Sequence, residues 1–266
     1  MQQVVTKYGY YLQSVANLLS RFHDPLLIVR IFTGKAGSGI KTVHCRRPDL
    51  RFEVRSAMDV WSVKEAIVDG FYEQYGFPVQ PGWTVVDIGA AIGEFAVYVA
   101  ASDSRNRVLA FEPFPESVTL LRDNVRLNKL TNVQVFAEAV SGQSGTIILD
   151  VSSGEPLQIE SRAVSTATDD QIEVTSVTLA DVLGRTKGDH IDLLKLDCEG
   201  SEYDIVLNTT PEILRRIDRI VMEYHDTLTQ HTHQDLVAFL EGHGYSVDAR
   251  PNAVHPNEIG YLRASR

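Results

Sequence analysis

The amino-acid sequence predicts an α/β protein with a doubly wound, mostly parallel sheet. From residue 83 onward, apolar runs of strand length alternate with segments of helical length, which is typical of a parallel sheet with helices on both faces. The first predicted strand ends in a turn that contains glycine, and the second ends in an acidic residue. This pair of features is typical of a nucleotide-type cofactor site at one edge of such a sheet. With 266 residues, 44% of them hydrophobic, the chain is neither disordered nor collagen-like.

Residues 1–80 differ in pattern from the rest and are predicted to form an N-terminal extension. Apolar side chains at three- and four-residue spacing predict an amphipathic helix over Tyr8–Phe22. We expect the apolar face of this helix to have one of three roles: it packs on the protein itself, it covers a pocket, or it joins a second copy in a homo-oligomer. Alternating apolar and polar side chains over Ile40–Arg47 and Leu50–Arg55 predict a β-hairpin. Asp59 is predicted to cap the helix that follows.

Residues 81–266 are predicted to form one cofactor-binding domain. The predicted strands are Thr84–Ile88, Arg107–Phe111, Val133–Ala137, Ile191–Leu196, Arg219–Met222, Tyr245–Asp248 and Ile259–Arg263. The predicted helices are Glu94–Ala101, Glu116–Lys129, Leu179–Leu183, Glu202–Asn208 and Gln234–Glu241. Two further β-type runs, Gly145–Val151 and Gln171–Val177, flank a polar loop, and we expect them to pair as an insertion at the edge of the sheet.

Charge and cysteine content limit the partners and the compartment that we expect. Twenty-five basic against 35 acidic side chains give a formal charge of −10, which disfavours nucleic acid and anionic membranes as partners. The two cysteines are too few for a disulfide framework and form no C-x-x-C metal motif. The N-terminal residues lack the pattern of a secretory leader, and the apolar run Leu26–Phe32 is too short to span a membrane. We therefore expect a soluble, cytoplasmic protein.

The turn after the first strand indicates the charge of the cofactor. In VVDIGAAIGEF, Asp87 precedes a turn that contains Gly89 and Gly93. Glycines let the backbone turn sharply and bring a ligand close to the N–H groups that begin the next helix, although a tight turn without a ligand has the same pattern. A dinucleotide site has the pattern G-x-G-x-x-G, and Asp87 would repel its pyrophosphate. The acid instead suits a cationic cofactor, S-adenosylmethionine. Glu112, at the end of the second strand, is placed to accept hydrogen bonds from both ribose hydroxyls.

Two neighbouring strands end in three carboxylates and one imidazole. Asp197 and Glu199 follow the fourth strand, while Glu223 and His225 follow the fifth. Because ligands bind at the carboxyl ends of parallel strands, we expect the four side chains to converge on one site. His225 is our first choice of general base, poised by Glu223 or another acid, because imidazole titrates near neutral pH.

Glu199 is our second choice of base, although it equally suits a structural role on backbone N–H groups of the next helix. Asp197 is expected to orient the amine of the cofactor or the substrate. The same side chains could hold Mg²⁺ or Mn²⁺, but nothing in their spacing requires a metal, and we predict none.

Five segments together resemble the FkbM family of S-adenosylmethionine-dependent methyltransferases: VVDIGAAIGEF, AFEPFPESVTLLRDNVRLN, NVQVFAEAVSGQSG, IDLLKLDCEGSEYDIV and RIVMEYH. The resemblance covers about residues 56–265. It implies a Rossmann-like, seven-stranded sheet whose last strand is antiparallel. It also implies methyl transfer to a hydroxyl oxygen of a small natural product, a glycan or a lipid-linked substrate. An NAD-dependent oxidoreductase and a non-catalytic cofactor-binding module remain as alternatives.

The resemblance also implies roles for individual residues in binding S-adenosylmethionine. Glu112 holds the ribose, and Glu138 meets the adenine amine. The sequence departs from the family at Ala91, where members often carry Asn, and we expect a change in local hydrogen bonding without loss of cofactor binding. The residues that surround the amino-acid part of the cofactor are Asp87, Gly89, Ala90 and Gly93.

Overall fold

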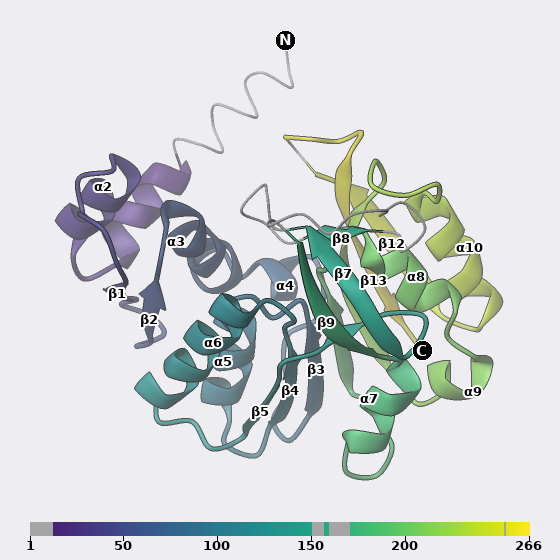
Figure 1. Ribbon diagram of the computed structural model, residues 1–266. Helices are drawn as coiled ribbons and strands as arrows, with labels where there is room; N and C mark the ends of the chain where they lie inside the picture. The colour runs from purple at the N-terminus through teal and green to yellow at the C-terminus, as the bar shows by residue number, and fades with distance from the viewer. Residues whose placement is uncertain (1–12, 151–156, 160–170, 253) are drawn as a thin grey trace.

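A seven-stranded sheet lies at the centre of the computed structural model, which describes residues 13–150, 157–159, 171–252 and 254–266 (Figure 1). Its strands are β3 (Thr84–Ile88), β4 (Arg107–Phe111), β5 (Val133–Phe136), β10 (Leu193–Leu196), β11 (Arg219–His225), β12 (Ser246–Pro251) and β13 (Ile259–Ser265). Their order across the sheet is β12-β13-β11-β10-β3-β4-β5. The pairs between β11, β10, β3, β4 and β5 are parallel, whereas β13 runs antiparallel to both of its neighbours. The predicted fold class is therefore confirmed, including its antiparallel last strand.

Helices cover both faces of this sheet. They are α5 (Glu94–Ser102), α6 (Pro115–Leu127), α7 (Leu179–Arg185), α8 (Ser201–Leu207), α9 (Pro211–Leu214) and α10 (His233–Gly242). Alternate side chains of a strand point to opposite faces, so that Val85 belongs to the core under α5 and α6 while Val86 belongs to the core under α7, α8 and α10. Because both faces are buried, all five residues of β3 are buried, and Thr84 and Asp87 are its only polar members.

The predicted insertion forms a second, separate sheet. β7 (Gly145–Asp150) and β9 (Gln171–Val177) pair antiparallel, as expected. β6 (Ala139–Val140) and β8 (Leu157–Ile159) complete a four-stranded sheet in the order β6-β9-β7-β8. Our prediction that the insertion joins the edge of the main sheet was therefore wrong, because β6 pairs with β9 after the chain has left β5.

The N-terminal extension contains more helix than we predicted. Its elements are a helix over residues 13–21, α2 (Pro25–Phe32), β1 (Lys41–His44), β2 (Arg51–Val54), α3 (Ala57–Val63), the π-helix η1 (Lys64–Val68) and α4 (Phe71–Gln74). The hairpin is confirmed by the antiparallel pairing of β1 with β2. Of the predicted Tyr8–Phe22 helix, the part before residue 13 lies outside the described residues. Leu18 and Phe22 are buried in the same apolar core as α5 and α6, so this part of the helix packs on the protein itself.

The start of α3 differs from the prediction by one turn. Ser56 is the N-cap, and its side chain accepts a hydrogen bond from the N–H of Asp59. Asp59 is the third helical residue, and its carboxylate accepts the N–H of Ser56 in return. This capping box satisfies N–H groups at both residues, which explains why an acid near the helix start is not itself the cap.

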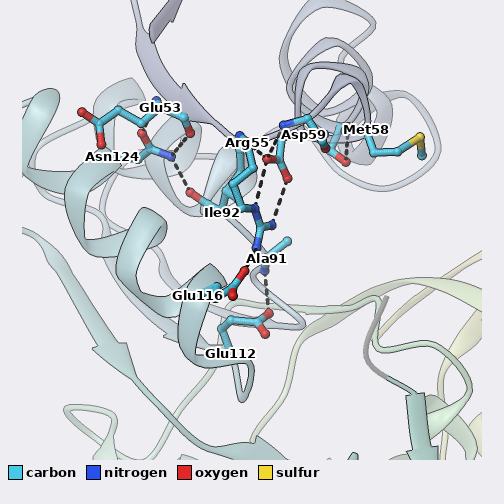
Figure 2. Close-up of polar contacts among 11 residues, drawn as sticks. Glu53, Arg55, Met58, Asp59, Ala91, Ile92, Glu112, Glu116 and Asn124 are labelled. Carbon is cyan, nitrogen blue, oxygen red and sulfur yellow. Dashed lines mark hydrogen bonds and ion pairs between the residues drawn. The ribbon is translucent and has the colours of Figure 1, made fainter. Parts of the chain in front are cut away.

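Two asparagines, Asn124 on α6 and Asn128 directly after its last residue, hold the hairpin against the main domain. Asn124 exchanges two hydrogen bonds with the backbone of Glu53, at 2.6 and 3.2 Å, and donates a third to the carbonyl of Ile92 at 2.9 Å (Figure 2). Asn128 exchanges two more with the backbone of Arg51, at 3.0 and 2.7 Å. The two side chains thus substitute for a neighbouring strand along β2, and Asn124 connects this edge directly to the glycine turn.

Among the described residues, no helix is both long enough and apolar enough to cross a membrane.

Candidate functional site

A cavity of about 790 Å³ opens at the carboxyl ends of β3, β4 and β10. Its walls come from three parts of the chain: the strand ends and the turns after them, the inserted sheet, and the start of α3 in the extension. Four of the predicted cofactor residues line it, namely Gly89, Glu112, Glu138 and Asp197, and so does the predicted base Glu199. The other predicted residues, Asp87, Ala90, Gly93, Glu223 and His225, are not among the residues that line the cavity, and all of them except Glu223 are buried.

The glycine turn brings three backbone segments into close contact. Gly89 has a φ of 72°, and a Cβ added there would overlap the carbonyl oxygen of Asp197. Gly93 has a φ of 87°, and a Cβ there would overlap the side chain of Leu121. Both positions therefore require glycine, and the first leaves a smooth backbone surface on the cavity wall.

Asp87 lies beneath the cavity and pairs with a lysine that sequence reasoning missed. It is fully buried, and its Oδ1 lies 3.0 Å from Nζ of Lys195 on β10. Lys195 also donates a hydrogen bond to the carbonyl of Gly89 at 2.7 Å and lies 4.0 Å from Asp197. Burial alone would lower the pKa of Lys195, but the two aspartates raise it above its ordinary value. Asp87 therefore acts on the turn through Lys195, and a lysine within the apolar run LLKLD was the signal for it.

Glu112 is held in a fixed orientation at the end of β4. Its two carboxyl oxygens accept hydrogen bonds from the N–H groups of Ala91 and Phe114, each at 2.8 Å. Burial raises the pKa of Glu112 to about 7, although both hydrogen bonds favour the ionised form. Ala91 has a φ of 45°, so this non-glycine residue adopts a left-handed conformation that aims its N–H at the carboxylate.

Glu138 lies beside a flat aromatic wall. Its carboxylate forms an ion pair with Arg185 of α7, whose guanidinium stacks 4.7 Å from the ring centre of Phe136. The rings of Phe111 and Phe136 stack in turn, with centroids 4.7 Å apart. Phe111, Ala139, Val140 and other apolar side chains line this part of the cavity, which is shaped for a planar group with a polar edge.

The strand-end acids and His225 converge as predicted. Ligand atoms of Asp197, Glu223 and His225 all lie within 4.8 Å of one another. Nε2 of His225 lies 3.6 Å from Glu199, and its Nδ1 lies 3.4 Å from Glu202. β11 continues through His225 instead of ending at Met222, so the imidazole is held by strand pairing.

Glu202 has the structural role that we considered for Glu199. It is fully buried and accepts the N–H groups of Cys198 at 2.7 Å and Gly200 at 2.9 Å. The side chain of Glu199 is 39% exposed and lies on the cavity wall. The residue itself adopts a left-handed φ of 51°, which turns its side chain away from the backbone of α8.

The charge of His225 is set by its acidic neighbours. Burial alone would lower the pKa of His225, but the carboxylates of Glu202 and Glu199 raise it to about 10. This shift favours the protonated imidazole at neutral pH, a form that cannot accept a further proton. The cluster of Asp197, Glu223 and His225 has the donor types of a divalent-cation site, and the ammonium of Lys195 lies 4.0 Å from Asp197.

Glu94, the first residue of α5, lines the cavity although sequence reasoning assigned it no role. The residue is only 6% exposed, and its Oε2 has no hydrogen-bond partner among the described residues. The signal was present in VVDIGAAIGEF, where an acid directly follows the last glycine. A buried carboxylate oxygen without a partner and an open glycine surface nearby both fit a cofactor that carries positive charge.

The extension supplies one cavity wall through the residues that follow β2. Arg55 pairs with Asp59 at 3.0 Å, and Figure 2 shows it pointing toward Glu116 above Ala91 and Glu112. Its second guanidinium nitrogen lies 3.9 Å from Glu116. Arg55 is the one cationic side chain among the described residues of the cavity wall.

Comparison with known proteins identifies similar chains. The family model described as "Methyltransferase FkbM domain" matches residues 87–247. The chain is 28% identical over 232 residues to the 31-O-demethyl-FK506 methyltransferase FkbM of Streptomyces tacrolimicus, covering 76% of this chain and 88% of that protein. It is 26% identical over 231 residues to the AMB antimetabolite synthetase AmbE of Pseudomonas aeruginosa, covering 72% of this chain but only 11% of that protein. A solved structure of the methyltransferase FkbM from Methylobacillus flagellatus is 16% identical, with a TM-score of 0.48 and coverage of 70% of this chain and 44% of that chain.

Proposed function

Because the chain belongs to the FkbM family of S-adenosylmethionine-dependent methyltransferases, we propose that it methylates a hydroxyl oxygen of a small natural product, a glycan or a lipid-linked substrate. The relative from Streptomyces tacrolimicus is named for a methylation on oxygen, which supports this choice of acceptor atom. The observation that carries the proposal is the position of Glu199, a partly exposed carboxylate on the cavity wall that lies 3.6 Å from the imidazole of His225.

The residues of the cavity suit the three parts of S-adenosylmethionine. Glu112 is placed for the ribose hydroxyls, since the amides of Ala91 and Phe114 already fix its orientation. Glu138 and the aromatic wall of Phe111 suit the adenine. The turn after β3 receives the amino-acid part, with Asp87, Ala90 and Gly93 supporting the turn from behind. When bound there, the cofactor supplies a sulfonium methyl group for direct displacement.

Glu199 is our proposed proton acceptor, in place of His225. A hydroxyl loses its proton as the new carbon–oxygen bond forms, so a base must stand within hydrogen-bond reach of the acceptor. Glu199 lines the cavity, whereas His225 is buried, is not among the lining residues, and has a raised pKa that favours its protonated form. His225 is better suited to orient Glu199 and to balance its charge across the 3.6 Å that separates them. Asp197 has a separate task, because its Oδ2 accepts the hydroxyl hydrogen of Tyr72 at 2.6 Å.

The test uses methyl-labelled S-adenosylmethionine with a panel of hydroxylated small molecules, glycans and lipid-linked acceptors. We expect one class to acquire a methyl ether, identified by mass spectrometry and NMR. Glu199→Gln should lower this turnover by roughly 10²–10⁴-fold while the affinity for S-adenosylhomocysteine stays within about twofold. The matched control is Glu241→Gln, which makes the same change on the exposed surface of α10.

Three results would contradict the proposal. A methyl group found on nitrogen or carbon would exclude the O-methylation, and labelling of RNA in preference to the panel would exclude the substrate class. Full activity of Glu199→Gln would exclude its role as the base. Saturable binding of NAD without binding of S-adenosylhomocysteine would instead favour the oxidoreductase alternative.

A further inference from the structure

One carboxylate on the cavity wall, that of Glu94, is only partly satisfied by the described residues. Glu94 is 6% exposed, and its Oε2 has no hydrogen-bond partner among the residues that the structure describes. Native proteins satisfy nearly all buried polar atoms, so an orphaned carboxylate oxygen on a residue that lines a cavity points to a ligand that donates hydrogen bonds.

The charged groups around Glu94 are already paired with one another. Lys195 on β10 contacts Asp87 at 3.0 Å and the carbonyl of Gly89 at 2.7 Å. Tyr72 on α4 donates its hydroxyl to Asp197 at 2.6 Å. Burial disfavours the ionised form of Glu94, and the negative charges of Asp87 and Asp197 add to this effect although Lys195 opposes it. The site therefore presents a carboxyl group whose ionisation depends on an added positive charge.

We propose that Glu94 binds the α-ammonium group of the amino-acid part of S-adenosylmethionine, and that Glu94 releases a proton when this group enters. The inference rests on the proposed cofactor and adds a residue to its site. The ammonium is the cofactor's only cationic group with N–H donors, whereas the sulfonium has none and cannot satisfy an orphaned acceptor. Asp197 is less suited to this role, because Tyr72 already occupies its Oδ2.

Proton release follows from the change in environment of the carboxyl group. Burial, reinforced by Asp87 and Asp197, raises the pKa of Glu94 to about 8 although Lys195 opposes the shift. An ammonium at hydrogen-bond distance stabilises the ionised form and lowers this pKa. Affinity for the ligand should therefore rise with pH below about pH 8, by up to tenfold per pH unit. This dependence should level off above that pH, where Glu94 is ionised before the ligand binds.

The experiment compares two ligands that differ in the amino-acid part. S-adenosylhomocysteine carries the ammonium, whereas 5′-methylthioadenosine retains the adenosine and lacks it. Glu112, whose pKa is also raised, faces the ribose that both ligands share, so its protons cancel in the comparison. Isothermal titration at about pH 6.5 in phosphate and in imidazole buffers, whose ionisation enthalpies differ, counts the protons exchanged. We expect wild-type protein to release about one more proton with S-adenosylhomocysteine than with methylthioadenosine.

The variant Glu94→Gln keeps the size of the side chain and removes its charge. We expect it to lose at least about tenfold in affinity for S-adenosylhomocysteine at pH 7.5, to keep its affinity for methylthioadenosine, and to lose the extra proton. The control Glu241→Gln should change neither the affinity for the two ligands nor the number of protons released.

Equal losses for both ligands, no loss for either, or equal proton counts in the wild-type protein would each overturn the inference. The wild-type proton count does not depend on whether the variant folds. If the wild-type protein bound neither ligand, the proposed function itself would fail, so the two failures are distinguishable.

Discussion

Replacing Lys195 with methionine tests whether the buried pair under the glycine turn holds the site together. The Nζ of Lys195 lies 3.0 Å from Asp87, and both side chains are almost completely excluded from water. Lys195→Met keeps the apolar stem and leaves the fully buried Asp87 without a cation. Removing one partner of such a pair destabilises proteins by about 3–5 kcal/mol, because the remaining charge must be buried alone or neutralised.

The pH dependence gives the same prediction a second measurement. Burial already raises the pKa of Asp87 while Lys195 opposes the shift, so loss of Lys195 should raise that pKa further. A carboxyl group whose pKa is higher in the folded than in the unfolded state destabilises the fold as pH rises above its unfolded value, about 3.9. The free energy of unfolding that Lys195→Met loses relative to wild type should therefore be smaller at about pH 5 than at about pH 8.

Urea unfolding followed by circular dichroism at both pH values measures the free energy of unfolding directly. The double variant with Asp87→Leu as well should recover part of the loss, because neither charge then remains buried. A loss below about 1 kcal/mol, or a deficit that grows toward acidic pH, would refute the reasoning and show that Asp87 and Lys195 do not act as a pair.

Two further substitutions test the turn and the attachment of the hairpin. Gly89→Ala should lower the affinity for S-adenosylhomocysteine by at least about tenfold in calorimetry. The added Cβ overlaps the carbonyl of Asp197, and the φ of 72° is strained for alanine. Unchanged affinity would show that the turn relaxes freely. Asn124→Ala removes three hydrogen bonds to Glu53 and Ile92 and should destabilise the protein by about 2–4 kcal/mol, with faster amide exchange in β2. Unchanged exchange there would show that apolar packing alone holds the hairpin.

The main sheet could be predicted from sequence because its strands are buried on both faces. β3, β4 and β10 are short apolar runs between polar turns, and each was placed to within a few residues. β6 and β8 are not predicted, because strands of two and three residues are too short to show an alternation of apolar and polar side chains. The separate sheet that they complete depends on pairing with β7 and β9, which is tertiary information.

The sequence predicts where the residues of the candidate site lie, but not which chemical role each of them has. In the segment D-C-E-G-S-E, sequence alone does not show whether Glu199 or Glu202 accepts the backbone N–H groups at the start of α8. The backbone decides between them, since Glu199 and Gly200 both adopt left-handed φ values that turn Glu202 inward and Glu199 toward the cavity. His225 looked like a base because imidazole ordinarily titrates near neutral pH. Its pKa depends instead on Glu202 and Glu199, whose distances no sequence pattern gives.

The change of pattern at residue 80 does not separate the site from the extension. Side chains that follow β2 line the same cavity as the strand ends, and the extension shares its apolar core with α5 and α6. Asn124 bonds both Glu53 of the hairpin and Ile92 of the glycine turn, so a shift of one is transmitted to the other through a single side chain. Arg55 lies two residues beyond Glu53 and over Glu112, which places the extension's cation beside the proposed ribose site. Residues before 80 therefore contribute to the cavity wall, and we expect variation among them to alter both which acceptor enters and how the cofactor is held.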